Sequence, residues 1–117
     1  MTIQLADSLW VKEFSGAVTV CDPKGIILEM NDRAVRSFQD QGGEKLIGTN
    51  LLDCHPEDAR AKLKELMDTQ HVNVYTTEKE GVRKFIYQSP WYRNGEYSGF
   101  VEVWMEIPER ISHFIRD

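Results

Sequence analysis

Apolar and polar residues alternate in two parts of the chain, and turn signals interrupt both parts. In the first part, "AVTVCDPKGIILEMN", Val18 and Val20 alternate with Thr19 and Cys21 before the turn "DPKG". Asp at the first turn position, Pro at the second and Gly at the fourth are typical of a type I turn. The pattern therefore predicts two short antiparallel strands joined by a hairpin.

The same alternation fills most of the last third of the chain. "HVNVYTTEK" alternates, "EGVRK" supplies a turn, and "FIYQSPWY" runs back to the dipeptide Asn94-Gly95. Asn-Gly between two alternating segments is a strong hairpin signal, because both residues tolerate the positive φ of a tight turn. "SGFVEVWMEI" then predicts a last strand, and Pro108 ends it.

At the two ends of the chain, apolar residues recur three and four positions apart, as they do on one face of a helix. Leu5 and Leu9, and likewise Trp10 and Phe14, predict an amphipathic helix that ends at Gly16. At the other end, "ERISHFIRD" carries three apolar residues at helical spacing. We expect a helix there as well.

Two further helices are expected in the middle of the chain. "NDRAVRSFQDQ" predicts a helix capped by Asn31 or Asp32. "PEDARAKLKELMD" is the clearest helix, because Pro56 suits a first helical turn and Glu57 and Asp58 complement the helix dipole. Short helical turns are expected between these two helices, over "EKLIGTNLLD".

The order of these elements predicts an α+β domain with a five-stranded antiparallel sheet. Two consecutive hairpins require antiparallel pairing, and the central helices then cover one face of the sheet. We divide the chain into an N-terminal amphipathic helix (1–15), the main domain (16–108) and a C-terminal helical segment (109–117).

Composition narrows the function classes. The 117 residues carry 14 Lys plus Arg against 19 Asp plus Glu, a net charge of −5, which disfavours binding to nucleic acid. Two cysteines are too few for a disulfide framework, and Asp7 interrupts any secretory signal. No apolar stretch is long enough to span a membrane. We expect a cytoplasmic protein that binds neither nucleic acid nor membrane.

Three segments, taken in order, resemble a PAS domain. They are "VCDPKGIILEMNDRAV", "LIGTNLLDCHPED" and "RNGEYSGFVEVWMEI", and the resemblance extends over about residues 10–108. It implies a non-catalytic sensory and interaction module in signal transduction. Such a module binds a small molecule or cofactor between its helices and sheet, and acts on a partner such as a kinase or regulator. No effector domain is attached, so we expect action on a separate protein or a place within a longer receptor.

The chain departs from the PAS pattern at two places. The Asp-Ile-Thr triplet that often closes the last strand is replaced by Glu106-Ile107-Pro108, and Pro108 cannot donate a backbone hydrogen bond. The flavin-binding photoreceptors of the family carry Asn-Cys-Arg-Phe-Leu-Gln before the long helix. This chain has "TNLLDCHPED" there, which does not support flavin-adduct photochemistry.

Cys54-His55, just before the long helix, allows three interpretations. Asp53 or His55 caps the helix while Cys54 packs as a small apolar group. Alternatively, His55, or less favourably His71, ligates haem or a metal, as the resemblance allows. In the third interpretation Cys54 and His55 form a catalytic dyad, although no third orienting group is identifiable.

The faces of the predicted strands and helices indicate which residues line a ligand cavity. The resemblance implies a cavity for an unidentified ligand or cofactor between the central helices and the sheet. We expect its walls from Phe38, Leu52, His55, Leu63, Leu66, Tyr75 and Met105.

Aromatic residues occur on both faces of the last two predicted strands, so the second face requires a cover. We expect the N-terminal helix or a second subunit in a homodimer. The expected dimer interface comprises Leu9, Trp10, Phe85, Phe100 and Trp104. A ligand-free dimerisation or scaffold domain is the alternative function, followed by a haem-based gas or redox sensor through His55.

Overall fold

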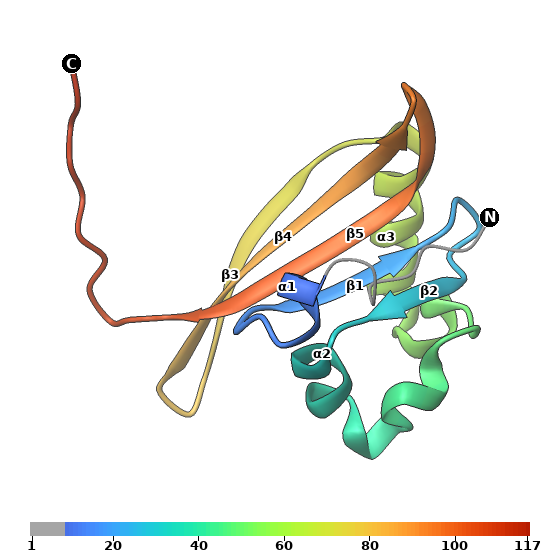
Figure 1. Ribbon diagram of the computed structural model, residues 1–117, viewed down its shortest axis with the longest axis horizontal. Helices are drawn as coiled ribbons and strands as arrows, with labels where there is room; N and C mark the ends of the chain where they lie inside the picture. The colour runs from blue at the N-terminus through green and yellow to red at the C-terminus, as the bar shows by residue number, and fades with distance from the viewer. Residues whose placement is uncertain (1–8) are drawn as a thin grey trace.

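The computed structural model describes residues 9–117, apart from the side chain of Cys54. Within these residues, five strands form one antiparallel sheet, flanked by α-helices and short 3-10 helices (Figure 1). The elements are α1 (Leu9–Lys12), β1 (Ala17–Cys21), β2 (Ile27–Met30), α2 (Asp32–Ser37), η2 (Gln39–Gln41), η3 (Gly43–Leu46), η4 (Leu51–Cys54), α3 (Glu57–Thr69), β3 (Asn73–Lys79), β4 (Val82–Arg93) and β5 (Glu96–Ile107).

The sheet has the strand order β2-β1-β5-β4-β3, and every neighbouring pair is antiparallel. Three predicted turns are confirmed. Asp22 Oδ1 accepts from the amides of Lys24 and Ile26 in the first turn, both at 2.9 Å. The β4–β5 turn has positive φ at Asn94 and Gly95, as a type I′ turn requires. The β3–β4 turn has the same geometry at residues 80–81.

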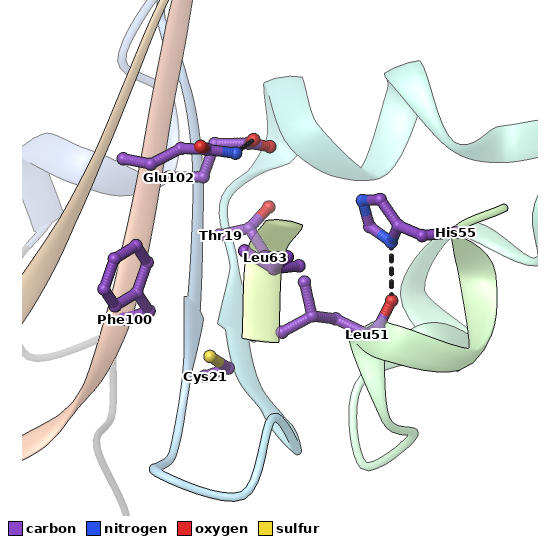
Figure 2. Close-up of a pocket in the computed structure, with 8 residues that line it drawn as sticks. Thr19, Cys21, Leu51, His55, Leu63, Phe100 and Glu102 are labelled. Atoms are coloured by element: carbon purple, nitrogen blue, oxygen red, sulfur yellow. Dashed lines mark hydrogen bonds between the residues drawn. The ribbon is translucent and has the colours of Figure 1, made fainter. Parts of the chain in front are cut away.

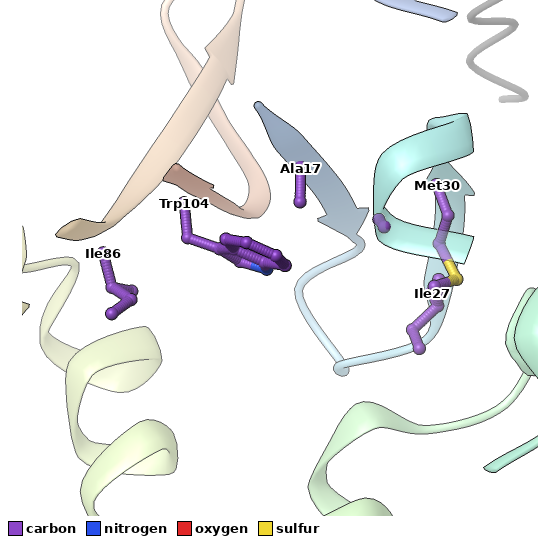
Figure 3. Close-up of a cluster of buried hydrophobic side chains, with 6 residues drawn as sticks. Ala17, Ile27, Met30, Ile86 and Trp104 are labelled. Carbon is purple, nitrogen blue, oxygen red and sulfur yellow. The ribbon is translucent and has the colours of Figure 1, made fainter. Parts of the chain in front are cut away.

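Helices α2 and α3 cover one face of the sheet, called the inner face here. Near α2, Ile86 of β4 and Trp104 of β5 belong to one apolar cluster (Figure 3), which also includes buried Ala34 of α2. Near α3, Leu63 packs with Phe100 of β5 in a second cluster that also includes Cys21, Leu66 and Met67. The inner face is therefore held by two separate apolar clusters, one under each helix.

The opposite, outer face carries a third cluster, in which Val11 of α1 packs with Val18 and Val20 of β1. This arrangement corrects three face assignments. Phe100 and Trp104, expected at a dimer interface, are 4% and 7% exposed in the inner-face clusters. Met105, expected in the cavity wall, lies one position along β5 from Trp104 and therefore on the outer face, 37% exposed.

Asn31 joins three elements through one buried side chain. Its Oδ1 accepts from the amides of Val18 (2.9 Å) and Ala34 (3.1 Å), so it caps α2 as expected. Its Nδ2 donates to the carbonyls of Val11 and Gly16, both at 2.9 Å. All four hydrogen bonds that an amide side chain can make are thus satisfied, at 1% exposure.

The two terminal helices differ from the sequence prediction. Helix α1 covers only Leu9–Lys12, and the predicted turn around Leu5 lies outside the described residues. Residues 108–117 form no helix and extend away from the sheet (Figure 1). The apolar residues Ile111, Phe114 and Ile115 are all exposed, so no packing against the sheet stabilises a helix there.

We expect Asn31→Ala to lower the free energy of unfolding by about 3 kcal/mol or more, because it orphans buried backbone groups in three elements. Chemical denaturation measures this. The matched control is Asp32→Ala, which removes an exposed ion pair to Lys12 and the acidic side chain of the first turn of α2. It is expected to cost about 1 kcal/mol or less. Equal losses in the two variants would contradict the role given to Asn31.

Candidate functional site

A cavity lies between the inner face and the segments around α2 and η4. Its less open compartment, called the enclosed compartment here, is partly open to solvent. It has a volume of about 130 Å³ and is lined by Thr19, Ile27, Met30, Phe38, Gln41, Leu46, Leu51, His55 and Glu102. An open compartment of about 300 Å³ adjoins it and shares Phe38, His55 and Glu102 with it. A further space of about 30 Å³ extends toward Leu63 and Phe100 (Figure 2). The three spaces therefore meet around His55 and Glu102.

A row of polar side chains crosses the inner face beneath this cavity. Cross-strand pairing aligns Asn73, Gln88, Glu102 and Thr19 on four adjacent strands. Asn73 Nδ2 donates to Gln88 Oε1 (2.9 Å), and Gln88 Nε2 donates to Glu102 Oε1 (2.8 Å). We call these four residues the polar row. It separates the two apolar clusters, because Trp104 and Phe100 flank Glu102 along β5.

His55 faces the polar row from the other side of the cavity (Figure 2). Its Nδ1 lies 2.7 Å from the carbonyl oxygen of Leu51. A carbonyl oxygen can only accept, so Nδ1 carries the proton. In the neutral ring, Nε2 is then an unprotonated acceptor. The 3-10 turn η4 thus fixes both the orientation and the tautomer of His55.

The helix-capping interpretation of "DCHP" is wrong for α3. Pro56 occupies the N-cap position, and no side chain caps the helix there. His55 instead bonds within its own turn, and Asn50 caps η4 by accepting from the Leu52 amide at 2.9 Å. Glu57 and Asp58 do lie in the first turn of α3, as expected.

The residues expected to line the cavity separate into three groups. Phe38, His55, Leu63 and Tyr75 border one or more of its compartments. Leu52 and Leu66 belong to the neighbouring apolar cluster under α3. Met105, on the outer face, borders none of these three compartments.

The sequence interpretation missed the polar row. Its signal was present: Glu102 lies two positions from Phe100 and two from Trp104, so a carboxylate shares a strand face with two large aromatic rings. A charged residue at such a position is rare unless it is paired, and here Gln88 pairs with it. The pairing of Gln88 and Asn73 with Glu102 depends on strand register, which the sequence does not reveal.

The other candidate residues contribute little to this site. Burial raises the pKa of the Cys21 thiol to about 11, which makes it a poor nucleophile at neutral pH. The side chain of Cys54 lies outside the described part of the structure, so its pairing with His55 is not tested. His71 is exposed and bonds Thr69. None of the helices described is long and apolar enough to cross a membrane.

We expect His55 to be the Nδ1–H tautomer, because only that form donates to Leu51. Long-range nitrogen–proton correlation spectra of the imidazole distinguish the two tautomers. His71 is the internal control, since its partner is a hydroxyl, which fixes neither tautomer. An Nε2–H signal for His55 in the neutral state would contradict this geometry.

Neither a protein-family model nor a curated protein matches this sequence. Solved structures do resemble it. The PAS domain of BvgS from Bordetella pertussis has 16% identity and a TM-score of 0.65, covering 87% of this chain and 84% of that one. A sensory box histidine kinase from Vibrio cholerae has 18% identity and a TM-score of 0.59, covering 89% and 90%.

The Aer2 receptor of Vibrio cholerae, described as a dual PAS-heme oxygen sensor, has 15% identity and a TM-score of 0.59. The match covers 80% of this chain and 95% of that one. These structural similarities concern the fold as a whole. The chain therefore has the fold of a PAS domain.

Proposed function

We propose that this chain is a PAS-type sensory module that binds a small molecule in the cavity and relays its occupancy to a signalling partner. The observation that carries the proposal is the polar row, which places a carboxylate and two amides between the two apolar clusters of the covered sheet face. An apolar cavity with a few convergent polar groups is the usual form of a small-molecule site. Solved structures with this fold include parts of sensor histidine kinases.

The segments that form the cavity suggest how binding of a guest is transmitted to a partner. His55 and Leu51 belong to the turn that leads directly into α3, and Leu63 of α3 borders the cavity. A guest that contacts this turn favours some positions of α3 over others. Signal transfer is then a shift between conformational populations, whose size is set by the differential affinity of the guest.

We expect Leu46→Trp to abolish ligand binding, because the larger side chain fills the enclosed compartment. Native mass spectrometry of freshly purified protein detects a retained small molecule, and its loss from the variant locates it. Ile47→Trp is the matched control, because Ile47 is the neighbouring residue and lines a different surface groove. A wild-type protein that neither retains nor takes up any small molecule would favour the ligand-free scaffold instead.

Haem binding through His55 is the second candidate. It is supported by the unprotonated Nε2 that faces the cavity, and by the name of the Aer2 relative. The shape of the space argues against it. Drug-sized ligands occupy about 300–1,000 Å³, whereas the enclosed compartment offers about 130 Å³ and the adjoining space of about 300 Å³ is open to solvent. A Soret band that is lost in His55→Ala would establish haem despite this restriction, and we expect no such band.

We also propose that the module forms a homodimer through α1 and the outer face. Leu9 and Trp10 of α1 are 77% and 70% exposed. Half-buried Phe85 and exposed Met105 pair across β4 and β5 on the same face. Exposed apolar groups that lie together are typical of an interaction surface. We further propose that the module acts in the cytoplasm, on a partner such as a kinase or regulator.

We expect sedimentation analysis to show a dimer that Trp10→Ser combined with Phe85→Ser converts to a monomer. The physical reason is the loss of apolar area, at about 25 cal/mol per Å² buried. Phe114→Ser is the control, because Phe114 is equally aromatic and exposed but lies in the C-terminal segment. A wild-type monomer at all accessible concentrations would contradict the dimer.

A further inference from the structure

The size of the enclosed compartment limits the part of a guest that can enter it. A cavity of about 150 Å³ accommodates one benzene molecule, and the enclosed compartment measures about 130 Å³. Five of its lining side chains are apolar: Ile27, Met30, Phe38, Leu46 and Leu51. This part of the site therefore fits a single ring or a hydrocarbon group of similar size.

The polar groups at this compartment favour a guest that donates hydrogen bonds. Gln88 donates to Glu102 and itself accepts from Asn73, so this hydrogen-bonded series of side chains ends at the Glu102 carboxylate. Thr19 and Gln41, which also line the compartment, carry groups that can both donate and accept. On the opposite side, His55 uses its Nδ1 proton on Leu51, and its neutral ring presents Nε2 as an acceptor. Two acceptors thus face each other across the space.

The charged side chains near the compartment also favour a guest that donates hydrogen bonds. Among the described residues that line the enclosed compartment, Glu102 is the only Asp, Glu, Lys or Arg. The nearby cation, Lys84, lines only the open compartment, where its Nζ lies 4.1 Å from the centroid of the Trp104 ring. The guanidinium carbon of Arg33 lies 4.6 Å from the centroid of the same ring. Arg33 also forms an ion pair with Glu106, with 3.3 Å between Nη2 and Oε1. The basic side chains are thus held at Trp104, and the carboxylate faces the enclosed space.

We propose that the cavity selects a single-ring guest carrying a nitrogen group that donates hydrogen bonds, and that a cationic group is preferred over a neutral one and an anionic one is excluded. An amidinium or similar planar cation can donate two parallel N–H bonds to the Glu102 carboxylate. The ring then occupies the apolar compartment. This inference rests on the proposed function, because it names the ligand class of the same cavity.

Three isosteric probes test the proposal: benzamidine (cation), benzamide (neutral) and benzoate (anion). Calorimetric titration measures each affinity, and amide chemical shifts of Thr19 and Leu51 verify that binding occurs in the cavity. We expect benzamidine to bind at least about tenfold more tightly than benzamide and benzoate not to bind. In Glu102→Gln, benzamidine should lose at least about tenfold in affinity while benzamide stays within about threefold.

Lys84→Met is the matched control, because it removes a charge from the open compartment only. It should leave benzamidine affinity unchanged or raise it slightly. If Glu102→Gln does not fold, the order of the three probes on the wild type still decides the matter. Equal binding of all three, or a preference for benzoate, would overturn this inference and leave the proposed small-molecule site intact. Absence of cavity shifts with every probe, and with toluene as an apolar ring, would overturn the proposed site itself.

Discussion

The arrangement of this fold depends on one buried amide. Asn31 closes four hydrogen bonds that connect α1, the start of β1 and the first turn of α2. A buried amide is costly unless every donor and acceptor is paired, so the three elements must meet at one geometry. That geometry places α2 on the inner face and α1 on the outer face of the same strand. The position of the cavity follows, because α2 forms one side of it.

The cavity exists because the polar row separates two apolar clusters. Trp104 packs under α2 and Phe100 packs under α3, while Glu102 between them is engaged by Gln88 within the sheet. Close apolar packing over this row would bury a carboxylate without enough partners, which is unfavourable. The helical cover therefore meets the sheet on both sides of the row and leaves space above it, next to His55. A guest that donates a hydrogen bond to Glu102 supplies the partner that this carboxylate would otherwise lack.

Local chemistry specified much of this fold in advance. The turns at Asp22 and at Asn94-Gly95, the cap at Asn31 and the acidic first turn of α3 form as expected, because each depends on residues close together in sequence. The predictions that were wrong also have physical reasons. Residues 109–117 have the spacing of a helix but no surface to pack on. His55 bonds the carbonyl four residues before it rather than capping the helix after it. Of the expected cavity residues, Phe38, His55, Leu63 and Tyr75 border the cavity, whereas Leu52 and Leu66 pack beside it and Met105 lies on the outer face.

By itself, the sequence determined the strands, the two central helices and the antiparallel pairing. It also determined which side chains of a strand share a face, because the period of two is a local property of the backbone. Only the tertiary structure decided which face of β5 is covered. Both faces carry large apolar groups, so the pattern is symmetric, and the choice depends on where Asn31 and the connections direct the helices. The alignment of Asn73, Gln88 and Glu102 is likewise a matter of strand register, which arises from contacts between segments distant in the chain.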